Sequence, residues 1–246
     1  MGPYRWATEV QIHVNEMLIR RQIRWSLVYL VLALAFLSGG FVASLAPNDP
    51  VLQYAIPMPS LVIGLLLWWR NQSLLARWGP RTRQDPVLAR GLRGLDDRHH
   101  LFAFTHPSLP DYLMVGPMGV LVVVPRQVTG TVSCYDDRWR QEQRRSAVAR
   151  VFGWLAPRAA LGNPTDEAQR GIQATYKFLS GRTESIQGDL RVDTAVVFTA
   201  PKVELRLHGC PVPVLQLKSL RGYVRRLPKT LSPSEAATLV EMLRAV

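Results

Sequence analysis

The sequence predicts an α/β domain with a mixed sheet, preceded by a hairpin of two transmembrane α-helices. Two observations lead to this fold class. Two runs without a charged side chain, 25–45 and 51–69, lie near the start of the chain. After them, short runs of aliphatic and β-branched residues alternate with amphipathic segments, a pattern typical of a sheet flanked by helices.

The two uncharged runs contain 21 and 19 residues. Each is close to the ~20 residues that cross a hydrocarbon core ~30 Å thick. A buried pair of core helices is one alternative, and a signal peptide is another for the first run. A signal peptide has a shorter apolar stretch, however, and here a second apolar run follows at once. Because the connector at 46–50 only turns the chain, we expect the helices to be antiparallel neighbours.

Cationic side chains flank this hairpin at both outer ends: Arg5, Arg20, Arg21 and Arg24 before it, and Arg70, Arg77, Arg81 and Arg83 after it. Cytoplasmic flanks of membrane spans carry an excess of Lys and Arg. We therefore expect a two-span protein of the cell inner membrane with both termini in the cytoplasm. Residues 1–24 are expected to form a cytoplasmic segment, helical over 6–24, that leads into the first span.

The soluble part is strongly basic. Residues 70–246 carry 26 Lys and Arg against 15 Asp and Glu, which accounts for most of the net charge of +12. Such a domain is attracted to membrane lipids of the anionic cytoplasmic leaflet, and equally to nucleic acid. Cys134 and Cys210 lie far apart and in no metal-ligand spacing, so we expect free cytoplasmic thiols.

The elements of the soluble part are predicted in chain order. The Arg-rich linker 70–98 is expected to contain a helix near 87–95. Strands are predicted at 101–105, 112–115, 120–124 and 130–135, with a turn at 116–119 and an irregular basic stretch at 136–162. The uninterrupted aliphatic run 120–124 is typical of a strand that is buried on both faces.

Helices dominate the rest of the chain. Asn163 and Pro164 are predicted to begin a helix that reaches about residue 179. Strands follow at 194–199 and 212–215, and a helix at 217–227. Ser232, with Glu235 three residues later, predicts a capping box at the start of a terminal helix that reaches Arg244.

The segment PDYLMVGPMGVLV at 110–122 resembles the nuclease-related domain (NERD) family. The likeness continues through Gly162-Asn163-Pro164, the strand ending at 197–199, the strand at 211–214 and the helix start at 231–233. It covers roughly residues 85–245. The resemblance implies a restriction-endonuclease-like mixed sheet flanked by helices, with the NERD-like domain at 99–246.

The resemblance also implies metal-assisted phosphodiester hydrolysis, in which an acid on one strand and a Glu-x-Lys on the next hold a divalent cation such as Mg²⁺. Asp111 stands at the first acidic position. Val124-Pro125-Arg126 stands at the Glu-x-Lys position, so the second carboxylate is missing and arginine replaces lysine. Glu167 stands where the family's Asn-Pro-x-x-Gln segment has glutamine.

Because of these changes we expect a non-catalytic, membrane-anchored NERD-like binding or assembly module, an accessory subunit with membrane protein partners. One alternative is a membrane-tethered metal-dependent nuclease whose catalytic residues are Asp111, Arg126 and Glu167. The other is a nucleic-acid-binding tether without hydrolysis. Asp111 is also consistent with a turn residue, and Glu167 with an acid that favours a helix start.

Two groups of basic residues are candidate contacts for nucleic acid or another anionic surface. The first, with Tyr135 interleaved, is Arg126, Arg138, Trp139, Arg140, Arg144 and Arg145, and the second is Lys218, Arg221, Arg225 and Arg226. Arginines neutralise phosphates and aromatic rings stack on bases. A solvated or membrane-facing basic surface explains the same residues.

Overall fold

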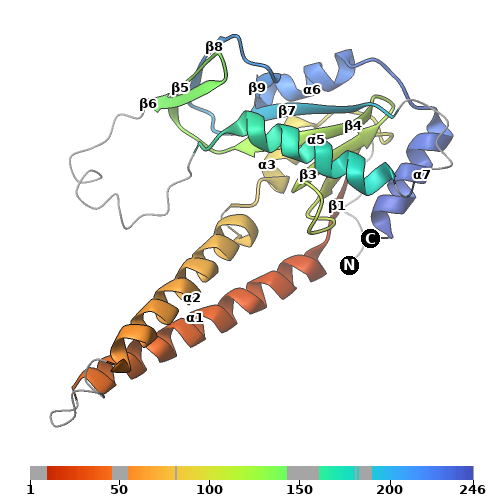
Figure 1. Cartoon of the computed structure of the whole chain (residues 1–246). Helices are drawn as coiled ribbons and strands as arrows, with labels where there is room; N and C mark the ends of the chain where they lie inside the picture. Colours follow the sequence, from red (N-terminus) through yellow and green to blue (C-terminus); the bar gives the residue numbers. More distant parts are fainter. Residues whose placement is uncertain are drawn as a thin grey trace. The chain divides into compact units, whose positions relative to one another are not determined.

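The computed structural model describes residues 10–45, 55–80, 82–142, 161–180, 182 and 190–245. The chain divides into two units, one formed by residues 1–15 and 84–246 and the other by residues 16–83. A helical unit is therefore inserted into an α/β domain, after the first strand of that domain (Figure 1).

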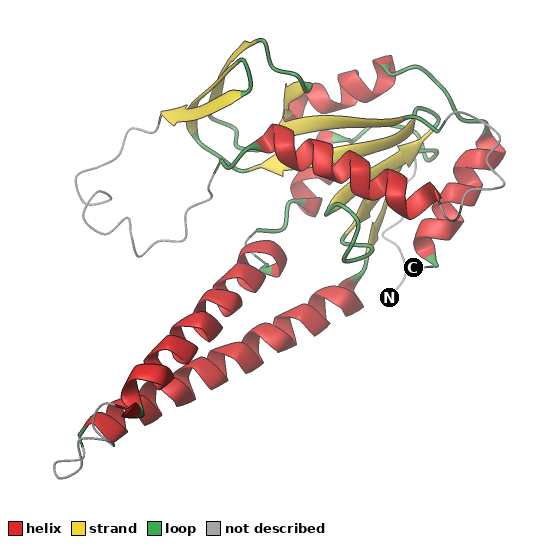
Figure 2. Cartoon of the chain, viewed as in Figure 1, coloured by secondary structure: helices red, strands yellow, loops and turns green. Residues whose placement is uncertain are grey.

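The helical unit consists of α1 (Glu16–Ser44) and α2 (Pro57–Trp78), which pack side by side (Figure 2). Gly40 near the end of α1 lies against Ser60 near the start of α2, and Ser26 near the start of α1 bonds to Asn71 in the second half of α2. The two helices are therefore antiparallel, as predicted. One helix in the described part of the chain, α1, is long and apolar enough to span a membrane. The predicted connector, 46–50, lies outside the described residues.

The prediction of a helix over 6–24 is wrong in its middle. Residues 11–14 form strand β1 (Gln11–Val14), and α1 begins only at Glu16. β1 pairs in parallel with β2 (His100–Ala103), so that His13 lies beside Phe102. The sequence did not predict β1 because it is an edge strand of only four residues, and its partner strand lies some 90 positions away in the sequence.

The larger sheet is mixed, as predicted. Its order is β1-β2-β3-β4-β7-β9, with β3 at Tyr112–Gly116, β4 at Gly119–Arg126, β7 at Val192–Phe198 and β9 at Val214–Gln216. β2, β3 and β4 are antiparallel neighbours, while β4, β7 and β9 are parallel. The turn predicted at 116–119 joins β3 to β4, and Gly119 adopts a φ of 97° there, which favours glycine.

Helices cover this sheet on both faces (Figure 1). α5 (Pro164–Ser180) lies over β4 and β7, and α7 (Pro233–Arg244) contacts β3. α3 (Asp85–Gly91) and α6 (Leu217–Arg226) pack on each other on the opposite side. Val122 and Val123 of β4 are 0% and 2% exposed, so β4 is buried on both faces, as its sequence predicted.

A second, three-stranded sheet has the order β6-β5-β8, with β6 at Arg138–Glu142, β5 at Gly130–Tyr135 and β8 at Val203–His208. The sequence predicted only β5. Asp136 and Asp137 form the β5–β6 turn with φ values of 46° and 65°. Such a turn usually contains glycine, so the Asp-Asp pair did not indicate a β-hairpin at this position.

The expectation of free thiols is wrong. Cys134 and Cys210 form a disulfide with 6.1 Å between their Cα atoms. The reason is the parallel pairing of β5 with β8, which places Leu207 opposite Cys134 and brings the chain just after β8 alongside it. Sequence spacing of 76 residues carries no trace of this proximity.

Helix boundaries follow the sequence more closely. The predicted helix at 87–95 is α3 at Asp85–Gly91, and α5 starts at Pro164 as expected. The capping box at α7 is confirmed: the Glu235 amide donates to the Ser232 hydroxyl at 3.3 Å, and the Ser232 amide donates to the Glu235 carboxylate at 2.8 Å.

Candidate functional site

The residues that the sequence predicted for a nuclease-like site lie toward one end of the larger sheet. Leu113 of β3 pairs with Val122 of β4, so continuing this register two residues onward places Asp111 opposite Val124. Val124 is 3% exposed and offers no oxygen. The Asp111 carbonyl accepts a hydrogen bond from the Phe104 amide at 2.8 Å, which ties this turn to the end of β2.

Arg126 and Glu167 form a forked ion pair at the same end. The two Arg126 Nη atoms donate to the two Glu167 carboxylate oxygens at 2.5 and 3.3 Å. Arg126 also donates from Nε to the Leu161 carbonyl at 3.1 Å and from Nη1 to the Pro125 carbonyl at 3.2 Å. Bidentate arginine–carboxylate pairs are among the stronger hydrogen-bonded pairs. The arginine is thus held inside the protein, with only 16% of its side chain exposed.

The start of α5 positions Glu167 for this pair. The Asn163 side-chain oxygen accepts from the Thr165 and Asp166 amides at 3.1 and 3.4 Å, which satisfies donors that have no partner within the helix. Trp139 donates from Nε1 to the Thr165 hydroxyl at 3.0 Å. This contact links the three-stranded sheet to α5.

A buried polar network that the sequence did not reveal lies beside Arg126. The side-chain amide of Gln84 donates to the Gln127 side chain at 2.9 Å and accepts from the Thr199 hydroxyl at 2.8 Å. The backbone N–H of Gln84 donates to the Tyr112 hydroxyl at 2.7 Å. The Thr199 amide donates to the Arg126 carbonyl at 3.0 Å. Gln84 and Thr199 are 6% and 7% exposed. Neutral amides and hydroxyls therefore pair with one another at this end of the sheet.

This arrangement does not fit the divalent cation that the resemblance implied. Within the described residues, no three His, Cys, Asp or Glu side chains gather as a metal site would require. Val124 supplies no ligand, and the Glu167 carboxylate is engaged by Arg126. Magnesium prefers oxygen ligands from one or two carboxylates with ideal octahedral geometry. We therefore derive no metal-dependent step for this site.

Structure separates the first group of basic residues. Arg138 and Arg140 are exposed on β6, whereas Arg144 and Arg145 lie outside the described residues. Trp139 points the other way: its ring lies 6.3 Å from that of Phe198, and its indole nitrogen bonds to Thr165. It supports the core and does not offer a stacking face beside the arginines.

The second group lies on α6. Arg221 donates to the Arg93 carbonyl at 3.1 Å, and Arg225 donates to the Gly94 carbonyl at 2.5 Å. Cations near a helix C-terminus stabilise its carbonyls and dipole, and these two arginines hold the turn just after α3. Lys218 and Arg226 are exposed on the same helix.

Comparison with known proteins gave no match: no protein-family model, no curated protein and no solved structure is similar to this chain. The class that the structure defines is a mixed α/β domain with an inserted helix pair. The NERD resemblance stays a prediction.

Proposed function

We propose that the chain is a two-span membrane protein whose soluble domain is a non-catalytic binding or assembly module with a NERD-like, restriction-endonuclease-like fold. The observation that carries the non-catalytic assignment is the Arg126–Glu167 fork beside buried Val124. The proposal places the domain in a membrane complex as an accessory subunit, where its surfaces and not its chemistry are used.

The surface of the helix pair supports the membrane anchor. Large apolar side chains are exposed along both helices, including Leu34, Phe41, Leu66 and Trp69 at 55%, 66%, 58% and 72%. Several residues between the helices are small or polar, and Leu37 of α1 lies against Gly64 of α2. Fully buried Ala33 lies near Gly64, and Ser26 donates to Asn71 at 2.5 Å. Small and hydrogen-bonding residues inside with apolar residues outside is typical of helices that pack in lipid.

The chain order supports a second crossing, although α2 alone is less apolar than α1. β1 precedes α1, and its partner β2 follows α2, yet both strands belong to one sheet. If α1 crosses a membrane, the chain must return before β2 forms, and α2 is the described helix that lies between. Removal of α1 as a signal peptide would also remove β1 from the sheet.

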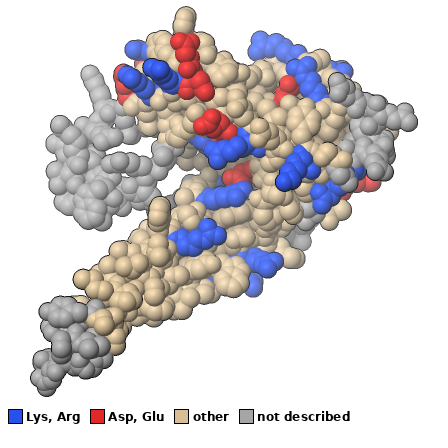
Figure 3. Space-filling model, viewed as in Figure 1, with Lys and Arg blue, Asp and Glu red and all other residues tan. Residues whose placement is uncertain are grey.

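Charge supports a cytoplasmic position for the domain. Figure 3 shows that Lys and Arg on the helix pair gather at one end, where α1 begins and α2 ends. By the positive-inside rule this end faces the cytoplasm. The Cys134–Cys210 disulfide favours an oxidising compartment instead. The charge distribution and the disulfide thus favour opposite orientations, which labelling of single cysteines distinguishes.

A nuclease assay tests the absence of catalysis. The full chain, purified in mild detergent, is incubated with DNA and with RNA in the presence of Mg²⁺ or Mn²⁺, and we expect no cleavage. Cleavage that is lost in Asp111→Asn would overturn the proposal, because it would show that Asp111 acts in an active site. Identification of proteins that copurify under the same conditions tests the assembly role, and recovery of the chain alone would count against it.

A second candidate function, a nucleic-acid-binding tether, rests on the outward face of the three-stranded sheet. The register aligns Arg140 and Arg206 on either side of Ser133, and Arg138 and His208 on either side of Tyr135. Tyr135 is 52% exposed. In a mobility-shift assay, Arg138→Gln with Arg140→Gln would weaken binding and reduce its salt dependence, whereas Arg170→Gln on α5 would not. Absence of any shift at physiological salt would remove this candidate.

A further inference from the structure

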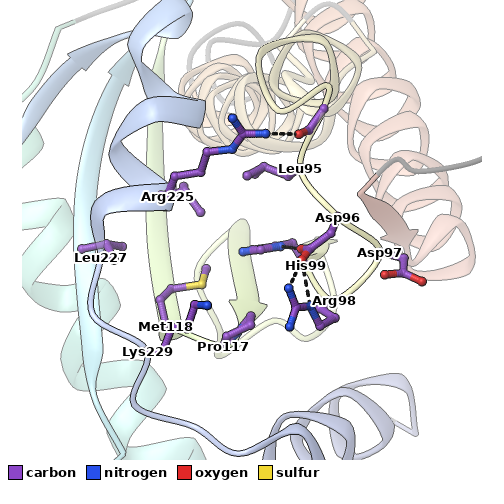
Figure 4. Close-up of a pocket in the computed structure, with 12 residues that line it drawn as sticks. Leu95, Asp96, Asp97, Arg98, His99, Pro117, Met118, Arg225, Leu227 and Lys229 are labelled. Carbon is purple, nitrogen blue, oxygen red and sulfur yellow. Dashed lines mark hydrogen bonds and ion pairs between the residues drawn. The ribbon is translucent and has the colours of Figure 1, made fainter.

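A cavity lies at the opposite end of the larger sheet from Arg126. It has a volume of about 610 Å³, within the range usual for small-molecule sites. Three segments form its walls: residues 94–99 between α3 and β2, the β3–β4 turn at 117–118, and the end of α6 with the loop that follows it at 224–229 (Figure 4). All three belong to the α/β domain, so the cavity does not depend on the position of the helix pair.

Three cationic side chains and two acidic ones line this cavity, so its net charge is positive. Arg98, Arg225 and Lys229 contribute to the lining, together with His99. Asp96 is already engaged by its neighbours, since Arg98 donates to it from Nε at 2.7 Å and His99 contacts it through Nδ1. Burial raises the pKa of Asp96, but the bonds and charges of Arg98 and His99 outweigh this and hold that pKa below its usual value. The Asp97 carboxylate lies apart from the other labelled side chains (Figure 4).

Apolar side chains also line the cavity. Leu95 and Met118 are 2% and 3% exposed, and Leu227 lies just after α6 in the same segment as Lys229. In Figure 4 the imidazole of His99 projects toward the side of Met118. The Asp96 carboxylate fixes the orientation of that ring through Nδ1, as carboxylates do for histidines at binding sites. The cavity thus presents cationic and apolar side chains to the same space.

We propose that this cavity binds a small organic anion, namely a phosphate monoester or carboxylate on a compact apolar body. Lys229 holds the anionic group together with Arg98, which keeps its ion pair with Asp96 through Nε and Nη2. His99 lies beside them, and Met118 and Leu227 contact the body of the ligand. Arg225 keeps its bond to the Gly94 carbonyl at 2.5 Å and forms the wall. The inference is independent of the proposed membrane and assembly function.

Binding is tested on the full chain in mild detergent, labelled with ¹³C on its methionine methyl groups. Phenyl phosphate is the probe, with inorganic phosphate and benzyl alcohol as its separate anionic and apolar halves. We expect phenyl phosphate to shift the Met118 methyl signal, which Met118→Leu assigns, at lower concentration than either half. Arg98→Gln with Lys229→Gln should weaken binding about tenfold or more, since charge-assisted hydrogen bonds are lost. Lys202→Gln, an exposed lysine of the turn before β8, should leave binding unchanged.

A lipid source of the same chemistry is separated by a second arm. Vesicles that contain phosphatidic acid present a phosphate monoester headgroup, and they are compared with phosphatidylcholine vesicles. If vesicles with phosphatidic acid displace phenyl phosphate and phosphatidylcholine vesicles do not, the ligand is a lipid headgroup. If neither kind of vesicle displaces phenyl phosphate, the ligand is a free small molecule. An absent Met118 shift, or a shift that Arg98→Gln with Lys229→Gln leaves unchanged, would overturn the proposal.

Discussion

Arg126 and Glu167 join the end of β4 to the first turn of α5 through two hydrogen bonds of 2.5 and 3.3 Å. Glu167→Ala would leave the guanidinium, only 16% exposed, without its carboxylate partner. Because Glu167 itself is half-exposed, the expected loss in the free energy of unfolding is about 1 kcal/mol. Urea unfolding of the full chain in detergent measures it. Glu241→Ala, on the exposed face of α7, is the control, and an equal effect of both changes would show that the fork does not stabilise the domain.

The sequence anticipated most of the larger sheet because its strands are dense in aliphatic residues. The run 120–124 predicted β4, and Ser232 with Glu235 predicted the start of α7. The sequence did not predict β6 or β8, because most of their residues are polar and exposed or only half-buried. Their partner strand, β5, also lies far from β8 in the sequence. Local pattern predicts elements that carry their own signal, but it does not predict an edge strand whose pairing depends on tertiary structure.

At the candidate site the sequence identified the positions but not their use. The absence of a carboxylate at Val124 could be predicted from the motif alone. The ion pair between Arg126 and Glu167 could not be predicted, because the two residues lie 41 positions apart and meet only when α5 packs on β4. The network at Gln84 was hidden for the same reason, since its partner Thr199 is 115 residues away.

Close packing between α1 and α2 depends on Gly64. A Cβ at this position would lie 2.7 Å from Cγ of Leu37, so Gly64→Leu would push the helices apart. Overpacking of this kind costs about 1–3 kcal/mol. Unfolding of the purified chain in mixed micelles of increasing SDS content measures the loss. Val62→Leu, at an exposed position of the same helix, should have little effect, and a matching loss there would indicate that the helices do not pack through Gly64.

Orientation in the membrane follows from the positive end of the helix pair. In a Cys134→Ser, Cys210→Ser background, single cysteines are placed at Asn48 in the connector and at Lys202 in the domain. A membrane-impermeant maleimide added to intact cells is expected to label Asn48→Cys, and to label Lys202→Cys only after lysis. The reverse pattern would place the domain outside, in agreement with the disulfide and against the charge distribution. Labelling of both sites in intact cells would show that the pair does not cross the membrane as a hairpin.

The disulfide ties β5 to the segment after β8. Reduction should therefore destabilise the three-stranded sheet, since a disulfide typically contributes about 2–4 kcal/mol. Thermal unfolding of the full chain with and without dithiothreitol measures the loss, and Cys210→Ser should abolish the difference. A maleimide-polyethylene glycol gel shift without reductant gives a second readout. Modification of Cys134 or Cys210 in the folded, unreduced protein would contradict the pairing.

His13 on β1 makes the domain sensitive to mild acid. Burial first, and then the charges of Arg244 and His100, lower the pKa of His13 from 6.5 to about 4. Arg244 donates to His13 Nε2 at 3.2 Å, so a proton on that nitrogen would meet a guanidinium. Burial and Arg244 likewise lower the pKa of His100, whose Nδ1 lies 3.2 Å from His13 Nε2.

Since the unfolded chain binds a proton at His13 near pH 6.5 and the folded chain only near pH 4, the stability that depends on neutral His13 is present above pH 6.5. It is lost as the pH falls from 6.5 to about 4. The melting temperature of the wild-type chain should drop across this window, and His13→Asn should reduce the drop because asparagine does not titrate. His208→Asn controls for the loss of a histidine from the other sheet. A wild-type profile that stays flat from pH 7 to about 4 would show that protonated His13 is tolerated beside Arg244.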